Sequence, residues 1–148
     1  MLLLVGCGSG TTEKKEEVKV TIDTDAFLKK VGEADIFDDT LAATRDSFIA
    51  EGLELTMDKI EFGKFFMGSG FTGEGYGVFK CKSKEDAEAI VEELKTFVEA
   101  QKGIYISYAP EAIPRFDGAI IKQKGSYVAY VAADKNVEAN KLVEEFFN

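Results

Sequence analysis

Hydrophobic residues recur at intervals of three and four in three segments of the chain, and this spacing predicts three amphipathic helices. The first segment follows a capping residue at position 23 or 24 and stops at Gly32. The second and longest follows the cap Ser83, and we expect it to continue past Gly103 to about residue 108. The third follows Asp134, which we expect to cap it, and its residues expected to face inward are Val137, Leu142, Val143, Phe146 and Phe147.

Segments rich in β-branched and aromatic residues predict strands over 76–82, 119–123 and 127–132, and either a strand or an irregular extended segment over 59–67. Gly125 and Ser126 lie between the last two strands and predict a tight type II′ hairpin turn. Residues 18–22 suit either a short edge strand or an extended lead-in to the first helix. Residues 35–57 are ambiguous, with a short helical piece that ends at Gly52.

From residue 76 onward the predicted elements follow the order β-α-β-β-α. Strands joined by a tight hairpin pair in antiparallel fashion, and amphipathic helices bury their apolar stripes against a sheet. The pattern therefore predicts an α+β fold, with a mainly antiparallel sheet and helices packed on one face. We assign this fold to a single domain at residues 20–148, because a chain of 148 residues is long enough to bury a core without disulfides or metals.

The composition narrows the classes of function. The net charge of −9 leaves no excess of Lys and Arg for phosphate contacts, so we expect no nucleic-acid partner. The same sign repels an anionic lipid surface, so membrane attachment must have another source. The chain has no histidine, which excludes Ser-His-Asp and Cys-His nucleophile systems and removes the commonest transition-metal ligand. We expect a protein that is not an enzyme and that binds no cofactor or metal.

The N-terminus supplies a source of membrane attachment. Leu4-Val5-Gly6-Cys7 is similar to a bacterial lipobox, in which the cysteine becomes the first residue after cleavage and carries the lipid. We interpret residues 1–6 as a truncated signal remnant, because a full signal has a basic segment and roughly 7–15 apolar residues. Residues 7–19 are typical of a flexible tether. Two acyl chains on Cys7 would hold the protein on the outer face of the cytoplasmic membrane. The alternative is a hydrophobic terminus with a chance cysteine.

The glycine-rich run from Met67 to Gly77 contains the pattern G-x-G-x-x-G at residues 68–73, which marks phosphate-binding loops in some folds. A dinucleotide loop requires a helix directly after it, but here a predicted strand follows. A kinase-type loop does join two strands, but it requires valine where this chain has Gly75, and Glu74 would repel phosphate. We therefore predict no nucleotide binding and interpret the run as a flexible connector between strands.

Four aromatic residues are candidates for contact with a partner, and packing in the core or at its rim is the alternative for each: Phe71, Tyr76, Tyr108 and Phe116. Cys81 lies in a predicted strand, and we interpret it as a small buried hydrophobic residue rather than a reactive thiol or half of a disulfide with Cys7. The acidic residues Asp35, Asp38 and Asp39 lack the ligand order of an EF-hand, so we interpret them as a solvated turn.

Besides the lipobox and the N-terminal helix, three stretches have a familiar form: Gly77-Val78-Phe79-Lys80, Tyr108-Ala109-Pro110-Glu111 and Gly125-Ser126-Tyr127-Val128. Together these features resemble a group of small lipoproteins of Gram-positive bacteria labelled domain of unknown function 4358. The resemblance covers roughly residues 22–148 and the lipobox. It implies a cell-envelope lipoprotein without an assigned activity, and it supplies no catalytic residues.

Three hypotheses for the function remain. The first is a lipid-anchored, non-enzymatic module that binds an envelope protein, peptide or glycan, or assists a transporter. The second is a carboxylate-based hydrolase of cell-wall glycans, which requires two carboxyl groups about 5–10 Å apart in a cleft. The third is a purely structural or inhibitory interaction protein. The first agrees best with the lipobox, the tether and the lack of a catalytic constellation.

Overall fold

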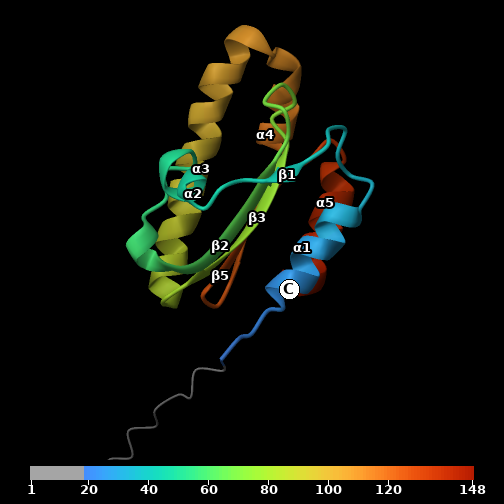
Figure 1. The fold of residues 1–148 in the computed structure, drawn as a ribbon. Helices are drawn as coiled ribbons and strands as arrows, with labels where there is room; N and C mark the ends of the chain where they lie inside the picture. The colour runs from blue at the N-terminus through green and yellow to red at the C-terminus, as the bar shows by residue number, and fades with distance from the viewer. Residues whose placement is uncertain (1–18) are drawn as a thin grey trace, which may run out of the picture.

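The computed structural model describes residues 19–148, and its centre is a five-stranded antiparallel sheet (Figure 1). The strands are β1 (Ala42–Ala43), β2 (Ile60–Met67), β3 (Gly75–Cys81), β4 (Ile120–Lys124) and β5 (Tyr127–Ala132). They lie in the order β1-β2-β3-β5-β4, so β3 is central while β1 and β4 are the edges. At the turn between β4 and β5, Gly125 has a φ of +58° and Ser126 has a negative φ, as the predicted type II′ turn requires.

Helices cover both faces of this sheet. They are α1 (Thr24–Glu33), α2 (Ser47–Glu51), α3 (Lys84–Tyr108), α4 (Ile113–Asp117) and α5 (Asn136–Phe147), with 3-10 turns at Met57–Lys59 and Pro110–Ala112. Figure 1 shows α3 on one face and the pair α1 and α5 on the other, and α2 and α4 pack on the α3 side. The α+β class, the antiparallel sheet and the order β-α-β-β-α are confirmed. The expected helical layer is present, and a second layer covers the opposite face.

Side chains of β3 and β5 point alternately to the two faces of the sheet, so the hydrophobic core has two parts. Phe79 of β3 and Tyr130 of β5 face α3, where they pack with Leu94. Val78 of β3 faces α1 and α5, where it packs with Phe27. Because both faces are covered, all six residues of β5 are buried, and its sequence is a continuous apolar run rather than an alternating one.

The predicted helix limits agree closely with the structure. The side chain of Asp23 caps α1 by accepting a hydrogen bond from Ala26 N at 2.9 Å. Ser83 Oγ caps α3 by accepting one from Asp86 N at 3.0 Å, and α3 continues through Gly103 to Tyr108. Residues 19–23 form neither helix nor strand. Within residues 19–148, no helix is both long and apolar enough to cross a membrane.

Two expectations for the last helix are wrong. Asp134 does not cap α5, because the N-cap position belongs to Lys135 and has no side-chain hydrogen bond. The Asp134 carboxylate instead accepts a hydrogen bond from Arg115 at 3.1 Å. Val137 does not face inward but is 63% exposed, because the buried stripe of the helix begins two residues later. That stripe consists of Ala139, Val143 and Phe147.

Candidate functional site

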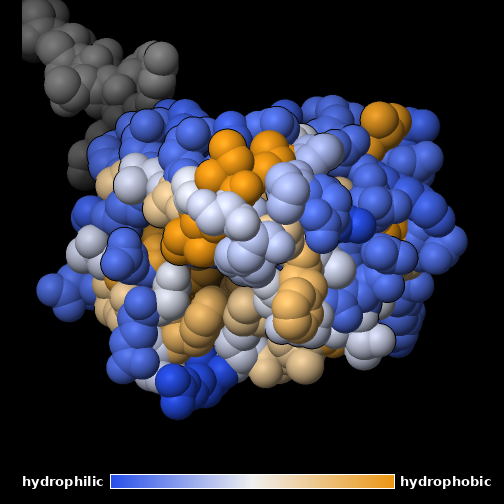
Figure 2. All heavy atoms as spheres, turned by 90° about the horizontal axis from the view of Figure 1, so that it is seen from above, coloured by the Kyte–Doolittle hydropathy of each residue, from blue (hydrophilic) through white to orange (hydrophobic). Residues whose placement is uncertain are grey.

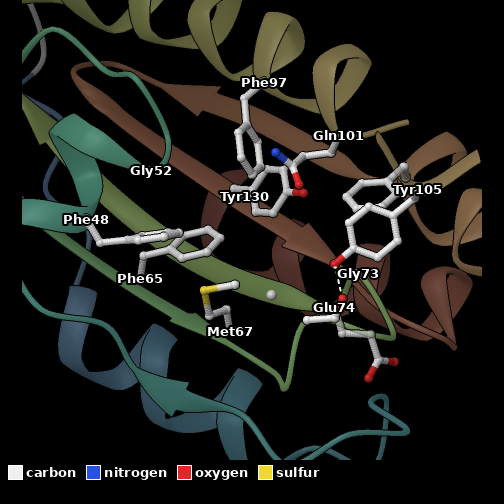
Figure 3. Close-up of a pocket in the computed structure, with 13 residues that line it drawn as sticks. Phe48, Gly52, Phe65, Met67, Gly73, Glu74, Phe97, Gln101, Tyr105 and Tyr130 are labelled. Atoms are coloured by element: carbon white, nitrogen blue, oxygen red, sulfur yellow. Dashed lines mark hydrogen bonds between the residues drawn. The ribbon is translucent and has the colours of Figure 1, made fainter. Parts of the chain in front are cut away.

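A cavity of about 210 Å³ lies between α3 and the sheet face formed by β2, β3 and β5 (Figure 3). Residues of α2 line one end, and the loop at residues 68–74 lines the other. Six aromatic side chains form most of its surface: Phe48, Phe65, Phe97, Tyr105, Phe116 and Tyr130. The remaining lining residues are Gly52, Met67, Gly70, Gly73, Glu74, Gly75 and Gln101.

The aromatic rings contact one another around this cavity. Phe65 stacks on Phe48 with ring centroids 6.0 Å apart, and its centroid lies 5.6 Å from that of Tyr130. Tyr130 meets Phe97 edge to face at 6.1 Å. Offset and edge-to-face pairs restrict the orientation of the rings, and they stabilise the fold by more than the burial of apolar surface alone. The cavity therefore has a preformed aromatic wall.

The polar groups at the cavity are neutral. Burial raises the pKa of both Tyr130 and Tyr105 above the usual value for tyrosine, so both hydroxyls are protonated at neutral pH. Gln101 reaches the cavity from α3, and its amide can donate and accept hydrogen bonds (Figure 3). The carboxylate of Glu74 is turned away from the cavity (Figure 3). A charged ligand would lose its hydration here without gaining a partner of opposite charge.

The glycine-rich loop is held by side chains from three other segments, namely the segment before β1, α3 and α4. Tyr105 and Tyr108 donate their hydroxyl hydrogens to the carbonyl oxygen of Gly70, at 2.7 and 3.1 Å. Asp39 Oδ2 accepts hydrogen bonds from the backbone N and the Oγ of Ser69, both at 2.8 Å. These bonds lower the pKa of Asp39. The run connects two strands, β2 and β3, as predicted. The side chains that hold it lie far away in sequence, so they left no local signal.

Glycine is required in this loop at two positions. Gly70 has a φ of +91° and Gly73 a φ of +72°, values that side chains with a Cβ rarely adopt. A Cβ at Gly73 would also lie 2.6 Å from the ring of Phe116. The G-x-G-x-x-G spacing thus reflects the turn geometry and the close approach of an aromatic ring.

Glu74 occupies the end of this loop and has a fully buried carboxylate, with a side-chain exposure of 0%. The carboxylate accepts hydrogen bonds from the backbone N–H groups of Asp38 at 3.0 Å, Asp39 at 2.8 Å and Asp134 at 3.0 Å. These donors belong to the segment before β1 and the segment after β5. Glu74 therefore joins three parts of the chain that meet at one end of the sheet.

Arg115 of α4 neutralises the charge of Glu74. Its Nε lies 3.5 Å from Glu74 Oε1, and its side chain is only 13% exposed. The guanidinium also donates to the carbonyl oxygen of Thr72 at 3.2 Å and to Asp134 Oδ1 at 3.1 Å. Asp38 Oδ2 lies 3.6 Å from the same group. The pair of Glu74 and Arg115 holds the glycine-rich loop against α4.

The structure separates the four predicted contact residues into two kinds. Tyr76 and Phe116 are core residues with exposures of 5% and 4%, so they present no surface to a partner. Phe71 is 71% exposed and Tyr108 is 52% exposed, and both lie beside Gly70 at the cavity. Figure 2 looks down on this end of the molecule and shows hydrophobic side chains gathered there among polar ones.

The other sequence candidates have structural roles. Cys81 is a free, buried thiol, and burial together with nearby carboxylates raises its pKa to about 12. Asp35 forms an ion pair with Lys135 at 2.7 Å. No cluster of acidic, Cys or His side chains suited to a metal occurs in residues 19–148. Cys7, the signal remnant at 1–6 and nearly all of the tether at 7–19 lie outside the described residues.

The arrangement supplies an aromatic cavity with uncharged hydrogen-bonding groups. Glu74 is the single acidic residue in the described lining, and its carboxylate is turned away from the cavity and engaged by backbone N–H groups, so this lining does not hold the two carboxyl groups that glycan hydrolysis requires. Sequence reasoning missed the cavity because its lining comes from separate segments. One signal was present: Glu74 is a lone acid at the start of an apolar strand, where a carboxylate must find partners.

Comparison with known proteins supports the family inferred from the sequence and does not address the lipobox. No curated protein and no solved structure matches the chain. One family model does match, and it covers residues 38–133, which include every strand together with α2, α3 and α4. Because this match spans well over half of the 148 residues, the chain belongs to the family described as Domain of unknown function (DUF4358).

Proposed function

We propose that this protein is a lipid-anchored component of the cell envelope, held on the outer face of the cytoplasmic membrane through Cys7. Its domain is a non-enzymatic binding module. The observation that carries the binding role is the aromatic cavity of about 210 Å³ beneath the tethered glycine-rich loop. The anchoring role rests on the lipobox at residues 4–7.

The ligand group that suits this cavity is a single ring or a branched alkyl group. An apolar cavity of about 150 Å³ is large enough to bind benzene, so this volume accepts a group of that size. Such a group can belong to a free small molecule or to the side chain of an envelope protein or peptide. The exposed rings of Phe71 and Tyr108 beside the cavity would contact the rest of that partner.

Filling the cavity is expected to abolish binding of a small apolar probe. In the unmodified protein, benzene should shift the NMR signals of the Met67 methyl group and of the Tyr105 ring, which line the cavity. In Gln101→Trp an indole occupies this space, and the shifts should disappear. Ala100→Trp places the same side chain at an exposed neighbouring position and should leave them unchanged. Benzene shifts that persist in Gln101→Trp, or that are absent from the unmodified protein, would contradict the proposed cavity site.

Lipid anchoring is tested separately through Cys7. Cells that express the full protein, with a complete signal sequence, should incorporate labelled palmitate into it and retain it in the membrane fraction. Cys7→Ser removes the thiol that carries the lipid, so the label should be lost. Cys81→Ser is the matched control, and its label should remain because that thiol is buried. Equal labelling of Cys7→Ser and the unmodified protein would refute the anchor.

A further inference from the structure

β4 is an edge strand that pairs on one side only, with β5. In a two-residue hairpin the residues next to the turn, Lys124 and Tyr127, share hydrogen bonds. Hydrogen-bonded pairs alternate along an antiparallel ladder, so the N–H and C=O groups of Ile121 and Gln123 point away from β5. Within residues 19–148 no acceptor engages these two N–H groups. The outer edge of β4 is therefore open for pairing with another strand.

A depression lies on each side of this open edge. The one on the α3 side has a volume of about 530 Å³, and its apolar lining residues are Val98, Phe116, Ala119 and Ile121. Its charged lining residues all form ion pairs: Lys95, Glu99, Lys102 and Asp117. The one on the α5 side has a volume of about 630 Å³ and contains Lys122 and Lys141. A strand added along β4 would direct its side chains alternately into these two depressions.

The two depressions differ in how many of their charged lining residues form ion pairs. On the α5 side, Asp117 is paired with Lys102 at 2.7 Å, and Glu144 accepts a hydrogen bond from Asn140. Lys122 and Lys141 form no ion pair within residues 19–148. Among the described residues, the α5 side therefore has two unpaired lysines against one unpaired carboxylate, that of Glu144, and keeps an excess of positive charge although the protein as a whole carries a net charge of −9.

We infer that β4 binds an extended segment of another protein as a sixth strand of the sheet. The segment has apolar side chains that enter the α3 side, alternating with acidic side chains that pair with Lys122 and Lys141. Strand addition of this kind draws affinity from backbone hydrogen bonds and specificity from alternate side-chain sites. The site is separate from the aromatic cavity and does not depend on the proposed function.

A second copy of this chain is the competing occupant of the edge. Antiparallel pairing of two β4 strands about Lys122 would place one lysine directly opposite the other, which is destabilising. An acidic segment meets no such repulsion. The lysines thus disfavour self-pairing and favour a segment of opposite charge.

Amide hydrogen exchange in the full protein tests the open edge. The probe is acetyl-Val-Glu-Val-Glu-Val-Glu-Val-amide at about 1 mM, a concentration suited to a weak interaction. Without the peptide, the amides of Ile121 and Gln123 should exchange fast, whereas that of Lys122 should be protected by β5. With the peptide, the two fast amides should slow by about twofold or more at half saturation. Amides that are already protected, or that do not respond to the peptide, would overturn the inference.

Methylating backbone nitrogens of the probe tests whether the peptide binds as an added strand or through charge attraction alone. In an antiparallel complex the valine N–H groups face β4, and in a parallel complex the glutamate N–H groups do. Methylating either the valine nitrogens or the glutamate nitrogens, whichever set faces β4, should therefore abolish binding. Methylating the other set should preserve it. Equal binding of both methylated peptides would overturn the inference.

Charge reversal tests the chosen occupant. Lys122→Glu should weaken binding of the unmethylated peptide on the order of tenfold, because it replaces an attraction across the strands by a repulsion. Lys29→Glu, on the exposed surface of α1, makes the same change in net charge away from this edge and should leave binding within about twofold. Equal effects of the two substitutions, or self-association of the protein through β4 in sedimentation experiments, would overturn the inference.

Discussion

Glu74→Ala is expected to lower the free energy of unfolding by about 3–5 kcal/mol, because it breaks a buried ion pair. The substitution removes the acceptor for the N–H groups of Asp38, Asp39 and Asp134, and it leaves Arg115 without its buried partner. The unpaired donors are part of this total, since a buried N–H group that loses its partner costs about 1–3 kcal/mol where no water replaces the acceptor. Urea unfolding followed by circular dichroism measures the change, and the melting temperature should fall by about 10 °C.

Two further substitutions test whether the buried carboxylate of Glu74 causes this loss of stability. Asp38→Ala removes another carboxylate near Arg115, but one that is 71% exposed and 3.6 Å away, so the change should stay within about 0.5 kcal/mol. Glu74→Gln keeps the size of the side chain and one acceptor oxygen, so its cost should be intermediate. If Glu74→Ala were no more destabilising than Asp38→Ala, the buried carboxylate would not be the group that joins these segments.

The sequence predicts the elements of this fold well because their signals are local. Ser83 as a cap and the stripe through Leu94 define α3 without knowledge of the rest of the chain. The hairpin at Gly125 is likewise encoded by its own turn residue. The predicted helix limits are wrong where a tertiary contact competes with a local cap. Asp134 is the example, because its carboxylate pairs with Arg115 of α4 rather than with the start of α5.

The layers and the candidate site were harder to predict, for a physical reason. A strand buried on both faces, such as β5, shows no alternation, and this was the available hint of helices on both sides. The cavity requires Phe48, Tyr105 and Tyr130 to meet, and they are distant in sequence. The glycine pattern at 68–73 was recognised, but the tethers that hold it depend on that same tertiary arrangement.

Both helices of the second layer lie outside the range that matches the family. The matched range 38–133 contains the whole sheet but neither α1 nor α5. These two helices cover the sheet face that carries Val78 and Val131. Without them that apolar face would be exposed to water, so α1 and α5 should contribute strongly to stability.

Phe27→Ala tests this contribution and is expected to cost about 3–5 kcal/mol, because a fully buried ring is replaced by a cavity. Phe27 is 0% exposed, and its ring centroid lies 5.4 Å from those of Phe146 and Phe147. Phe71→Ala is the matched control, since Phe71 is 71% exposed and its loss should change the unfolding free energy by less than about 0.5 kcal/mol. Urea unfolding compares the two variants directly. Similar values would mean that α1 and α5 do not form a packed second layer, and that the sheet is stable with one covered face.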